Sequence, residues 1–200
     1  QKTASASISE ITKIVTRLSL AYPNVTFRLL SDGKEVLHAL ASRSGAFEEH
    51  LALRIRDVLP SNYVERGCRV SYEDELVKIH GMVGLPSKAK ANRSGQYLFI
   101  NCRSVTSPKI SLAVQDAFAT RLQMRDHPIF VLHIEVDPAI VDVNVHPQKK
   151  EVRLSHEREI MNGVKKGVLK ALLKHEQPAA APVESIDFST LEVKESFAPL

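Results

Sequence analysis

The stretch that decides the fold of this chain is Asp142-Val143-Asn144-Val145-His146-Pro147-Gln148-Lys149-Lys150-Glu151-Val152-Arg153-Leu154. It begins with valines that alternate with polar residues, a pattern typical of a strand with one buried face. Proline removes a backbone donor and favours an extended residue before it, so the strand should end at His146. An extended pattern resumes at Glu151. The sequence therefore places Lys149 and Lys150 on a loop between two ordered segments, where an ammonium group can meet an anion; the alternative is a solvated turn.

Composition places the chain among ordinary soluble globular proteins. It has 200 residues, of which 44% are hydrophobic and 25% charged, enough for one or two domains with a core. The apolar runs are short and the first residues are polar, so we expect neither a transmembrane span nor a signal peptide. Cys68 and Cys102 match no metal or redox spacing. We therefore expect reduced thiols, an intracellular protein and no metal site, and the missing initiator Met suggests a piece of a longer protein.

Positive charge is concentrated in the middle of the chain. Residues 78–125 contain eight basic residues and one acidic residue, a net charge of +7, whereas the whole chain has a net charge of +4. A basic block of this kind favours a polyanion such as nucleic acid, although a solvated lysine-rich face is the alternative. Aromatic residues are 6% of the chain and do not alternate with the block, which argues against base stacking on single strands.

The first residues predict a helix followed by a hairpin. Ser7 and Glu10 fit a capping box at the start of an amphipathic helix over residues 8–22. Asp32-Gly33 is typical of a hairpin turn between two short strands. A helix and a hairpin are too small to enclose a core, so this part should be the tail of a further domain.

The rest of the chain alternates strands and helices. Three or four strands with long helices between them favour an α/β fold of the α+β type, a two-layer sandwich with a mixed sheet and helices packed on one face. From residue 176 on, proline, alanine and acidic residues are typical of a linker. In chain order we expect a helix over 47–58, an irregular segment over 61–69, a strand over 76–83, a basic loop over 85–95, a strand over 96–101, a helix capped by Ser107, a buried strand over 129–136 and a last helix after Ser155.

These residues resemble one known family. Asp142–Leu154 closely resembles the Asp-Val-Asn-Val-His-Pro-x-Lys-x-Glu-Val-Arg-Phe motif of the MutL family of DNA mismatch repair proteins, with Leu154 in place of an aromatic residue. Tyr97–Arg103 is similar to the family's apolar strand ending in Asn-Gly-Arg, with Cys102 in place of glycine. Ile11–Pro23 resembles the family helix that ends in a Leu-Ala-His-Pro-like phrase, and Gln1-Lys2-Thr3 resembles the end of a basic segment. The matches are collinear over residues 1–175.

The resemblance implies a domain organisation. Residues 1–43 would be the C-terminal tail of an ATP-binding domain of the gyrase, Hsp90, histidine kinase and MutL (GHKL) type. Residues 44–175 would be a transducer domain resembling a ribosomal-protein-type sandwich, and residues 176–200 the start of a flexible linker. ATP with Mg²⁺ would be the cofactor of the full-length protein. The family's Glu-x-x-x-Asn, Asp-x-Gly-x-Gly and Gly-Phe-Arg-Gly-Glu motifs are absent, so we expect no cofactor and no ATPase activity in these 200 residues alone.

The resemblance also implies a role for one lysine. Lys149 falls on the family position that reaches from the transducer domain to the ATP γ-phosphate, where a positive charge stabilises the charge that develops on the phosphoryl group. From a separate domain, it would couple hydrolysis to domain closure and to repair signalling. Asn144, His146 and Pro147 are expected to shape the loop rather than to react.

DNA is the second ligand that the resemblance implies, bound without sequence preference between paired N-terminal arms. A MutS-type mismatch recognition protein and a second copy in a homodimer are the implied partners, with no membrane. The location would be the bacterial cytoplasm near the nucleoid, or the nucleus of a eukaryote. The alternatives are a stand-alone nucleic-acid-binding module, or the transducer domain of a type II topoisomerase or an Hsp90 chaperone. The candidate DNA contacts are Lys88, Lys90, Arg93, Arg103, Lys109 and Arg121.

Overall fold

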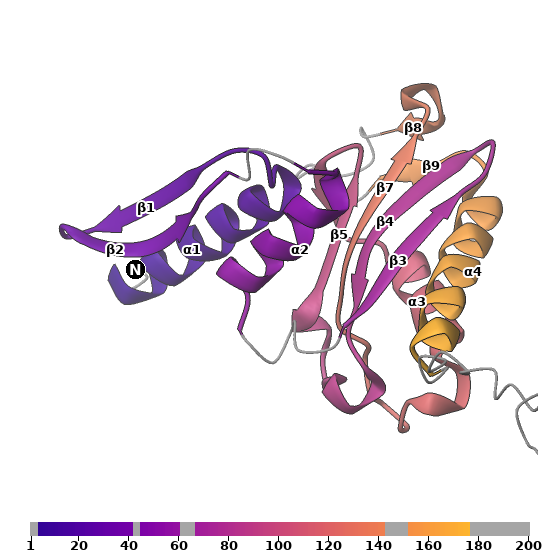
Figure 1. The fold of residues 1–200 in the computed structure, drawn as a ribbon. Coiled ribbons are helices and arrows are strands. Elements are labelled where there is room, and N and C mark those ends of the chain that lie inside the picture. The colour runs from indigo at the N-terminus through magenta and orange to yellow at the C-terminus, as the bar shows by residue number, and fades with distance from the viewer. Residues whose placement is uncertain (1–3, 42–44, 61–66, 143–151, 177–200) are drawn as a thin grey trace, which may run out of the picture.

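The computed structural model of this protein describes residues 4–41, 45–60, 67–142 and 152–176. A helix and a hairpin form one part, and a sheet with its helices forms the other (Figure 1). Helix α2 (Phe47–Val58) lies between the two parts. The first part consists of α1 (Ala4–Ala21), β1 (Phe27–Ser31) and β2 (Lys34–Ala39).

Five strands form one mixed sheet in the order β3-β4-β7-β5-β6. Strand β7 lies at the centre, where it pairs antiparallel with β4 and parallel with β5, and six of its seven residues are buried. The mixed sheet and the buried strand near its centre confirm the fold class predicted from the sequence. The strands are β3 (Cys68–Glu73), β4 (Val77–Val83), β5 (Gln96–Ile100), β6 (Arg103–Val105) and β7 (Phe130–Val136).

The structure corrects the predicted number of strands, because β3 and β6 join the expected ones. The irregular segment predicted over 61–69 ends earlier than expected, since β3 begins at Cys68. Buried Val70 alternates there with exposed Arg69 and Ser71, so polar residues obscure the strand pattern. Strand β6 has three residues, which are too few for a periodic signal.

Helices α3 (Pro108–Phe118) and α4 (Glu157–Glu176) pack on one face of the sheet (Figure 1). Helix α4 approaches β3 closely at Gly167, where an added Cβ atom would lie 2.9 Å from the Cβ atom of Tyr72. A larger residue would therefore push the helix away from the strand. The core between these layers includes Val70, Ile79, Phe118, Leu132, Ile134 and Val164.

The opposite face of the sheet is covered by α2 and by the end of α1. The two-layer expectation, with helices on one face, describes α3 and α4, and α2 adds a cover on the other face. A second buried cluster fills this junction and joins the hairpin part to the sheet. It includes Leu20, Leu51, Ile55, Phe99 and Val131.

The structure confirms two of the local turn and capping predictions and corrects a third. The Ser107 hydroxyl accepts a hydrogen bond from the first turn of α3 at 3.2 Å, which confirms the predicted cap. Asp32 and Gly33 have φ values of 51° and 74°, which confirms the predicted hairpin turn. The N-cap predicted at Ser7 is wrong, because α1 begins at Ala4 and Ser7 lies inside the helix.

A buried guanidinium group from α2 joins the hairpin part to the rest of the protein. Arg54 is 1% exposed and donates hydrogen bonds to the carbonyl oxygens of Ser19 and Pro23 at 3.0 Å each. It also donates to the carbonyl oxygens of Val25 at 2.6 Å and Leu40 at 3.0 Å. Burial lowers the pKa of Arg54, and the four carbonyl oxygens replace the water that the cation has lost.

We expect Arg54→Met to lower the free energy of unfolding by about 3 to 5 kcal/mol, because it leaves several buried carbonyl groups without a donor. Urea unfolding followed by circular dichroism measures the change. The matched control is Arg56→Met on the same helix, where the guanidinium group is exposed and only lies near Asp57; we expect a change of about 0.5 kcal/mol or less. Equal losses for both variants would contradict the anchoring role.

Candidate functional site

The base of the predicted lysine loop is a short antiparallel ladder. Strands β8 (Val141–Asp142) and β9 (Arg153–Leu154) pair directly, with Val141 opposite Leu154. Residues 143–151, which include Lys149, lie outside the described residues. Asn144, His146 and Pro147 also fall in this range. The ladder brings the two ends of the predicted loop side by side.

Asn101 attaches this end of the molecule to the sheet. Its Nδ2 atom donates to the Val136 carbonyl oxygen at 3.0 Å, and the Val136 amide donates to its Oδ1 atom at 3.0 Å. Its backbone amide donates to the Ile134 carbonyl oxygen at 2.9 Å. Asn101 and Cys102 form the β5–β6 turn with φ values of 47° and 62°, so the turn is kept with cysteine in place of glycine.

These contacts hold the end of β7, from which the chain leads into β8. A small pocket beside the turn is lined by Asn101, Arg103, Val141 and Val152. Asn101 belongs to the stretch that resembles the family's Asn-Gly-Arg strand end, and the sequence alone assigns it no role. The signal that could have identified it is a carboxamide residue at the end of a strongly apolar strand, next to a turn.

The structure brings together three of the six candidate DNA contacts. Lys88, Lys90 and Arg93 lie on the connection between β4 and β5, which contains two 3₁₀ turns. This connection is held by a bridge in which the backbone groups of Lys90 and His127 exchange hydrogen bonds of 2.9 and 2.7 Å. Arg103 begins β6 and pairs with Ile100, at the other end of β5.

The remaining two candidates connect helices. Lys109, near the start of α3, forms an ion pair with Glu157 at the start of α4. Arg121 follows α3 and forms an ion pair with Glu176 at the end of α4, with Nη2 and Oε2 2.9 Å apart. Because each cation already has a carboxylate partner, the contribution of these two residues to the positive field is reduced.

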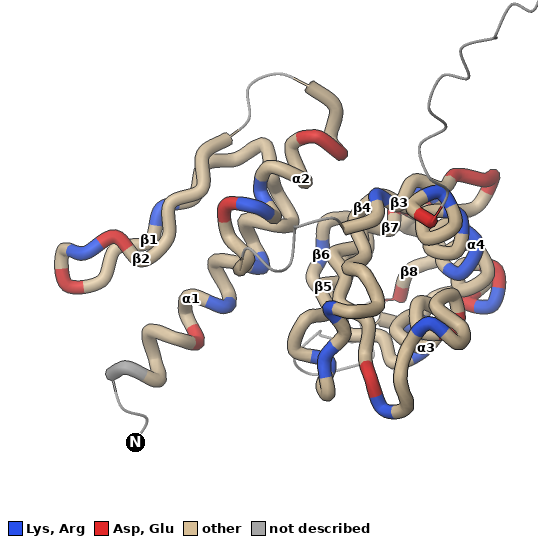
Figure 2. Tube along the Cα trace, turned by 60° about the horizontal axis from the view of Figure 1, so that its bottom comes forward, with Lys and Arg blue, Asp and Glu red and all other residues tan. Residues whose placement is uncertain are grey.

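Helix α4 presents further basic residues that the +7 block does not include. Figure 2 shows Lys and Arg positions on α4, on the side away from α1 and α2. Lys166, Lys170 and Lys174 line two neighbouring hollows on this helix. The described residues contain no group of three or more His, Cys, Asp or Glu side chains that could hold a metal ion. Among the described helices, none is long and apolar enough to cross a membrane.

Two buried histidines lie where α2 meets the sheet. His80 and His133 are partners across β4 and β7. His80 Nδ1 lies 2.7 Å from Glu48 Oε1, and His133 Nε2 forms a 3.1 Å hydrogen bond with the Leu20 carbonyl oxygen. His133 stacks on Phe99 with a centroid distance of 4.6 Å. Burial lowers the pKa of His133 to about 4, so its ring is neutral and packs like an aromatic core residue.

Comparison with known proteins decides the family. A family model described as the C-terminal domain of DNA mismatch repair proteins matches residues 55–173. MutL of Streptococcus pneumoniae strain CGSP14 is 34% identical over 194 residues, which are 97% of this chain and 29% of that protein. The chain belongs to the MutL family of DNA mismatch repair proteins. HexB of S. pneumoniae serotype 4 shows the same identity and coverage, so the chain spans about 29% of the length of these curated relatives.

Solved structures show the same fold at low sequence identity. The N-terminal domain of a DNA repair protein has a TM-score of 0.62 at 15% identity, covering 86% of this chain and 56% of that one. The Aquifex aeolicus MutL ATPase domain complexed with ADP has a TM-score of 0.51 at 16% identity, with 83% and 50% covered. The B subunit of Myxococcus xanthus DNA gyrase has a TM-score of 0.52 at 11% identity, with 84% and 50% covered. This MutL-type chain therefore shares its fold with about half of each of these chains.

The buried histidine makes stability depend on pH. Unfolded His133 takes up a proton near its ordinary pKa of about 6.5, whereas the folded group does so near about 4. Its contribution is therefore complete above about pH 6.5 and is lost as the pH falls to about 4, a loss of about 3 kcal/mol. Glu48 adds to the loss as the pH falls below the ordinary glutamate pKa of 4.5, because its own backbone hydrogen bond and His80 lower the pKa of Glu48 in the folded state.

We expect His133→Gln to flatten this slope in urea unfolding measured at several pH values, because the uncharged amide does not titrate. His38→Gln, on the exposed strand β2, serves as the control and should keep the parent slope. A parent slope in the His133 variant would contradict the assignment.

Proposed function

We propose that this chain is the transducer part of a MutL-type ATPase, and that Lys149 contacts the γ-phosphate of ATP bound by the preceding domain. The observation that supports the proposal is the β8–β9 ladder, which closes the base of the loop at the end of β7. The hydrogen bonds of Asn101 to Val136 hold that end in place. The ladder fixes the point at which the two ends of the loop leave this end of the molecule, which supports a lysine contact with a ligand beside it.

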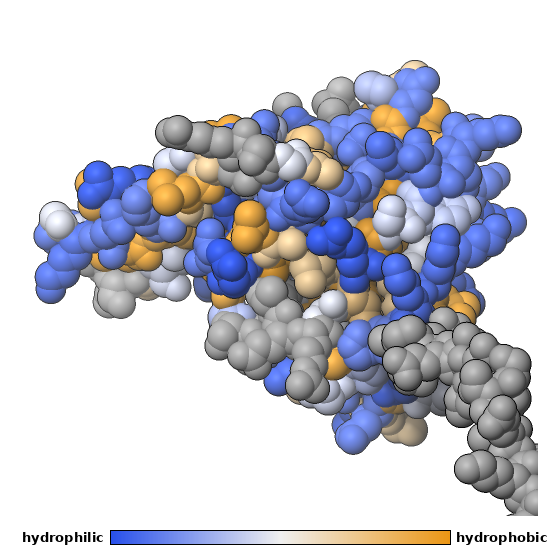
Figure 3. All heavy atoms as spheres, viewed as in Figure 1, coloured by the Kyte–Doolittle hydropathy of each residue, from blue (hydrophilic) through white to orange (hydrophobic). Residues whose placement is uncertain are grey.

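The surface of the first part fits the role of a domain tail. Several large apolar side chains of α1 and the hairpin are about half exposed, and Figure 3 shows hydrophobic residues interspersed with hydrophilic ones over this part. Large exposed apolar side chains on neighbouring elements favour a contact with further protein. We therefore assign residues 1–43 to the ATP-binding domain and residues 44–175 to the transducer domain. The exposed residues are Ile11, Ile14, Leu18, Leu30 and Leu40.

In this proposal the chain supplies one positive charge and no covalent chemistry. ATP and Mg²⁺ supply the phosphoryl group and its charge neutralisation, and residues outside this chain hold them. Lys149 stabilises the negative charge that develops on the γ-phosphate. Because the lysine contact exists only while that phosphate is present, hydrolysis releases the loop and the domain behind it. In this way the transducer domain reports the nucleotide state to the rest of a homodimer and to a MutS-type partner.

The basic connection between β4 and β5 is the proposed DNA contact. Lys88, Lys90 and Arg93 share this connection, so three basic residues lie close together in the chain. The carboxylate partners of Lys109 and Arg121 reduce the positive charge that those two residues can offer to DNA. Contacts of lysine and arginine with phosphates give binding without sequence preference that weakens as salt displaces the protein. The proposed DNA surface therefore centres on this connection, with Arg103 at a distance from it.

We expect Lys149→Ala to lower the ATPase turnover of the full-length protein by about 100-fold, in the range for loss of one group that stabilises transition-state charge. Steady-state phosphate release under saturating ATP is the measurement. Lys150→Ala is the matched control, since the neighbouring position is given no role, and it should keep turnover within about twofold. Unchanged turnover in the Lys149 variant would remove the γ-phosphate role.

We expect the double variant Lys88→Gln and Arg93→Gln to weaken DNA binding uniformly across sequences. The slope of log affinity against log salt should fall by about 2, because two phosphate contacts are lost. Fluorescence anisotropy with a duplex between low and physiological salt measures both. Arg121→Gln is the control, because Glu176 already neutralises that arginine. The proposed contacts would be wrong if the double variant left the salt slope unchanged. They would also be wrong if the Arg121 variant lowered the slope equally.

A further inference from the structure

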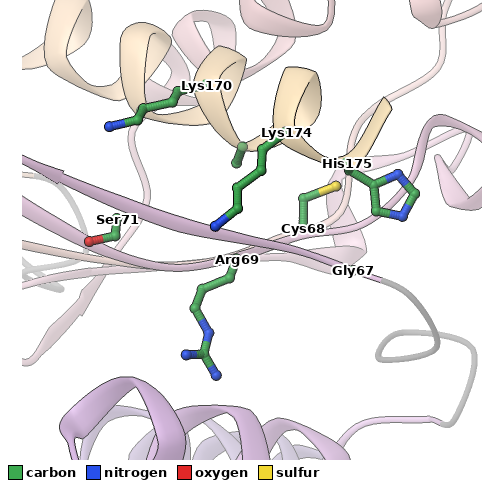
Figure 4. A pocket seen from close by; sticks show the side chains of 9 residues that line it. Gly67, Cys68, Arg69, Ser71, Lys170, Lys174 and His175 are labelled. Carbon is green, nitrogen blue, oxygen red and sulfur yellow. The ribbon is translucent and has the colours of Figure 1, made fainter. Parts of the chain in front are cut away.

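A groove with basic walls runs between the edge of the sheet and α4. Strand β3 is the edge strand, and the groove beside it has a volume of about 470 Å³. Figure 4 shows Lys170 and Lys174 extending from α4 toward β3, while Arg69 points away on the other side of the strand. The floor is partly apolar, with Cys68 and Ala171 among its residues.

The lysines of this groove have no counter-charge in contact with them among the described residues. Lys170 and Lys174 are spaced four residues apart and so lie along one side of α4. Neither forms an ion pair with another described residue, in contrast to Lys109 and Arg121. Lys166, which lines the neighbouring hollow, interacts electrostatically with Asp74. Like charges at this spacing repel one another, so an acidic occupant would stabilise the helix.

The edge of β3 adds backbone groups to this site. An edge strand presents unpaired N–H and C=O groups along its outer side, and these pair readily with another extended chain. Lysines beside an edge discourage such pairing by neutral or basic segments. The same lysines favour a segment whose carboxylates meet them, so the groove selects an extended acidic chain.

The chain itself contains an acidic segment that begins beside the groove. His175, in the last turn of α4, lines the groove, and residues 177–200 contain four acidic residues and one lysine. The first seven of these residues are uncharged and span up to about 23 Å. The distance along α4 from Glu176 to Lys170 is about 9 Å. Residues 177–183 are therefore long enough to let the acidic residues after them reach Lys170. The acidic residues are Glu184, Asp187, Glu192 and Glu195.

We propose that residues 184–195 of the same chain bind in the groove between β3 and α4, with carboxylates of Glu184 and Asp187 against Lys170 and Lys174. A short tether gives the segment a local concentration in the millimolar range. An acidic segment of another molecule must exceed that concentration to compete. Binding neutralises the basic side of α4 and covers the outer edge of β3, independently of the nucleotide and DNA roles proposed above.

Zero-length carbodiimide cross-linking followed by peptide mass spectrometry tests the contact. We expect links from Lys170 or Lys174 to Glu184 or Asp187, and their loss at high salt. A mixture of isotope-labelled and unlabelled protein separates links within one chain from links between chains. Links found only between labelled and unlabelled chains would overturn the proposal, because a second copy would then be the occupant.

Amide hydrogen exchange supplies a second, independent measurement. The double variant Glu184→Gln and Asp187→Asn should raise the exchange rate of the β3 edge about fivefold, the effect of losing two or three exposed ion pairs. Lys170→Gln with Lys174→Gln should do the same. Lys165→Gln, on α4 but outside the groove, is the matched control and should leave the rate unchanged. The proposal would also be overturned if none of the groove variants changed the exchange rate of the β3 edge.

Discussion

The arrangement of this molecule depends on the guanidinium group of Arg54. A buried cation without a carboxylate is unfavourable unless other groups replace its water. Here carbonyl oxygens at the end of α1, before β1 and after β2 surround it. The Ser19 oxygen belongs to the last turn of α1, where the helix dipole is negative and favours a cation. One side chain of α2 thus binds three segments at once and makes the hairpin part and α2 a single unit.

The other side of α2 packs against the sheet, so the same helix fixes the position of the hairpin part relative to the strands. Leu51 and Ile55 contribute to the buried cluster there, and Phe47 meets the His133 ring edge-on at a centroid distance of 5.0 Å. Strand β7 lies directly beneath and leads at its end to the β8–β9 ladder. A displacement of the hairpin part would therefore reach the loop base through packed side chains and one central strand.

The sequence predicted the elements with strong local patterns and missed those that depend on distant partners. The apolar run of β7 and the Ser107 cap are local, and both were confirmed. Strand β3 was not predicted, because exposed Arg69 and Ser71 interrupt its apolar pattern. The partner of Arg121 lies 55 residues away, so no local pattern could show that its charge is neutralised. The lysine loop was found through its family motif, and its own residues remain a prediction.

The glycines of α4 affect the order in which the chain folds. Gly163 and Gly167 let the helix lie against β3, but each lowers the intrinsic stability of an isolated helix by about 1 kcal/mol relative to alanine. Helix α4 is thus a weak helix by itself and forms with the help of the sheet it covers. During synthesis β3 emerges long before α4. Val70 and Tyr72 therefore stay exposed until α4, which covers them, has been made. A nascent chain interrupted before residue 157 would expose this strand, which makes incomplete products prone to aggregate or to bind chaperones.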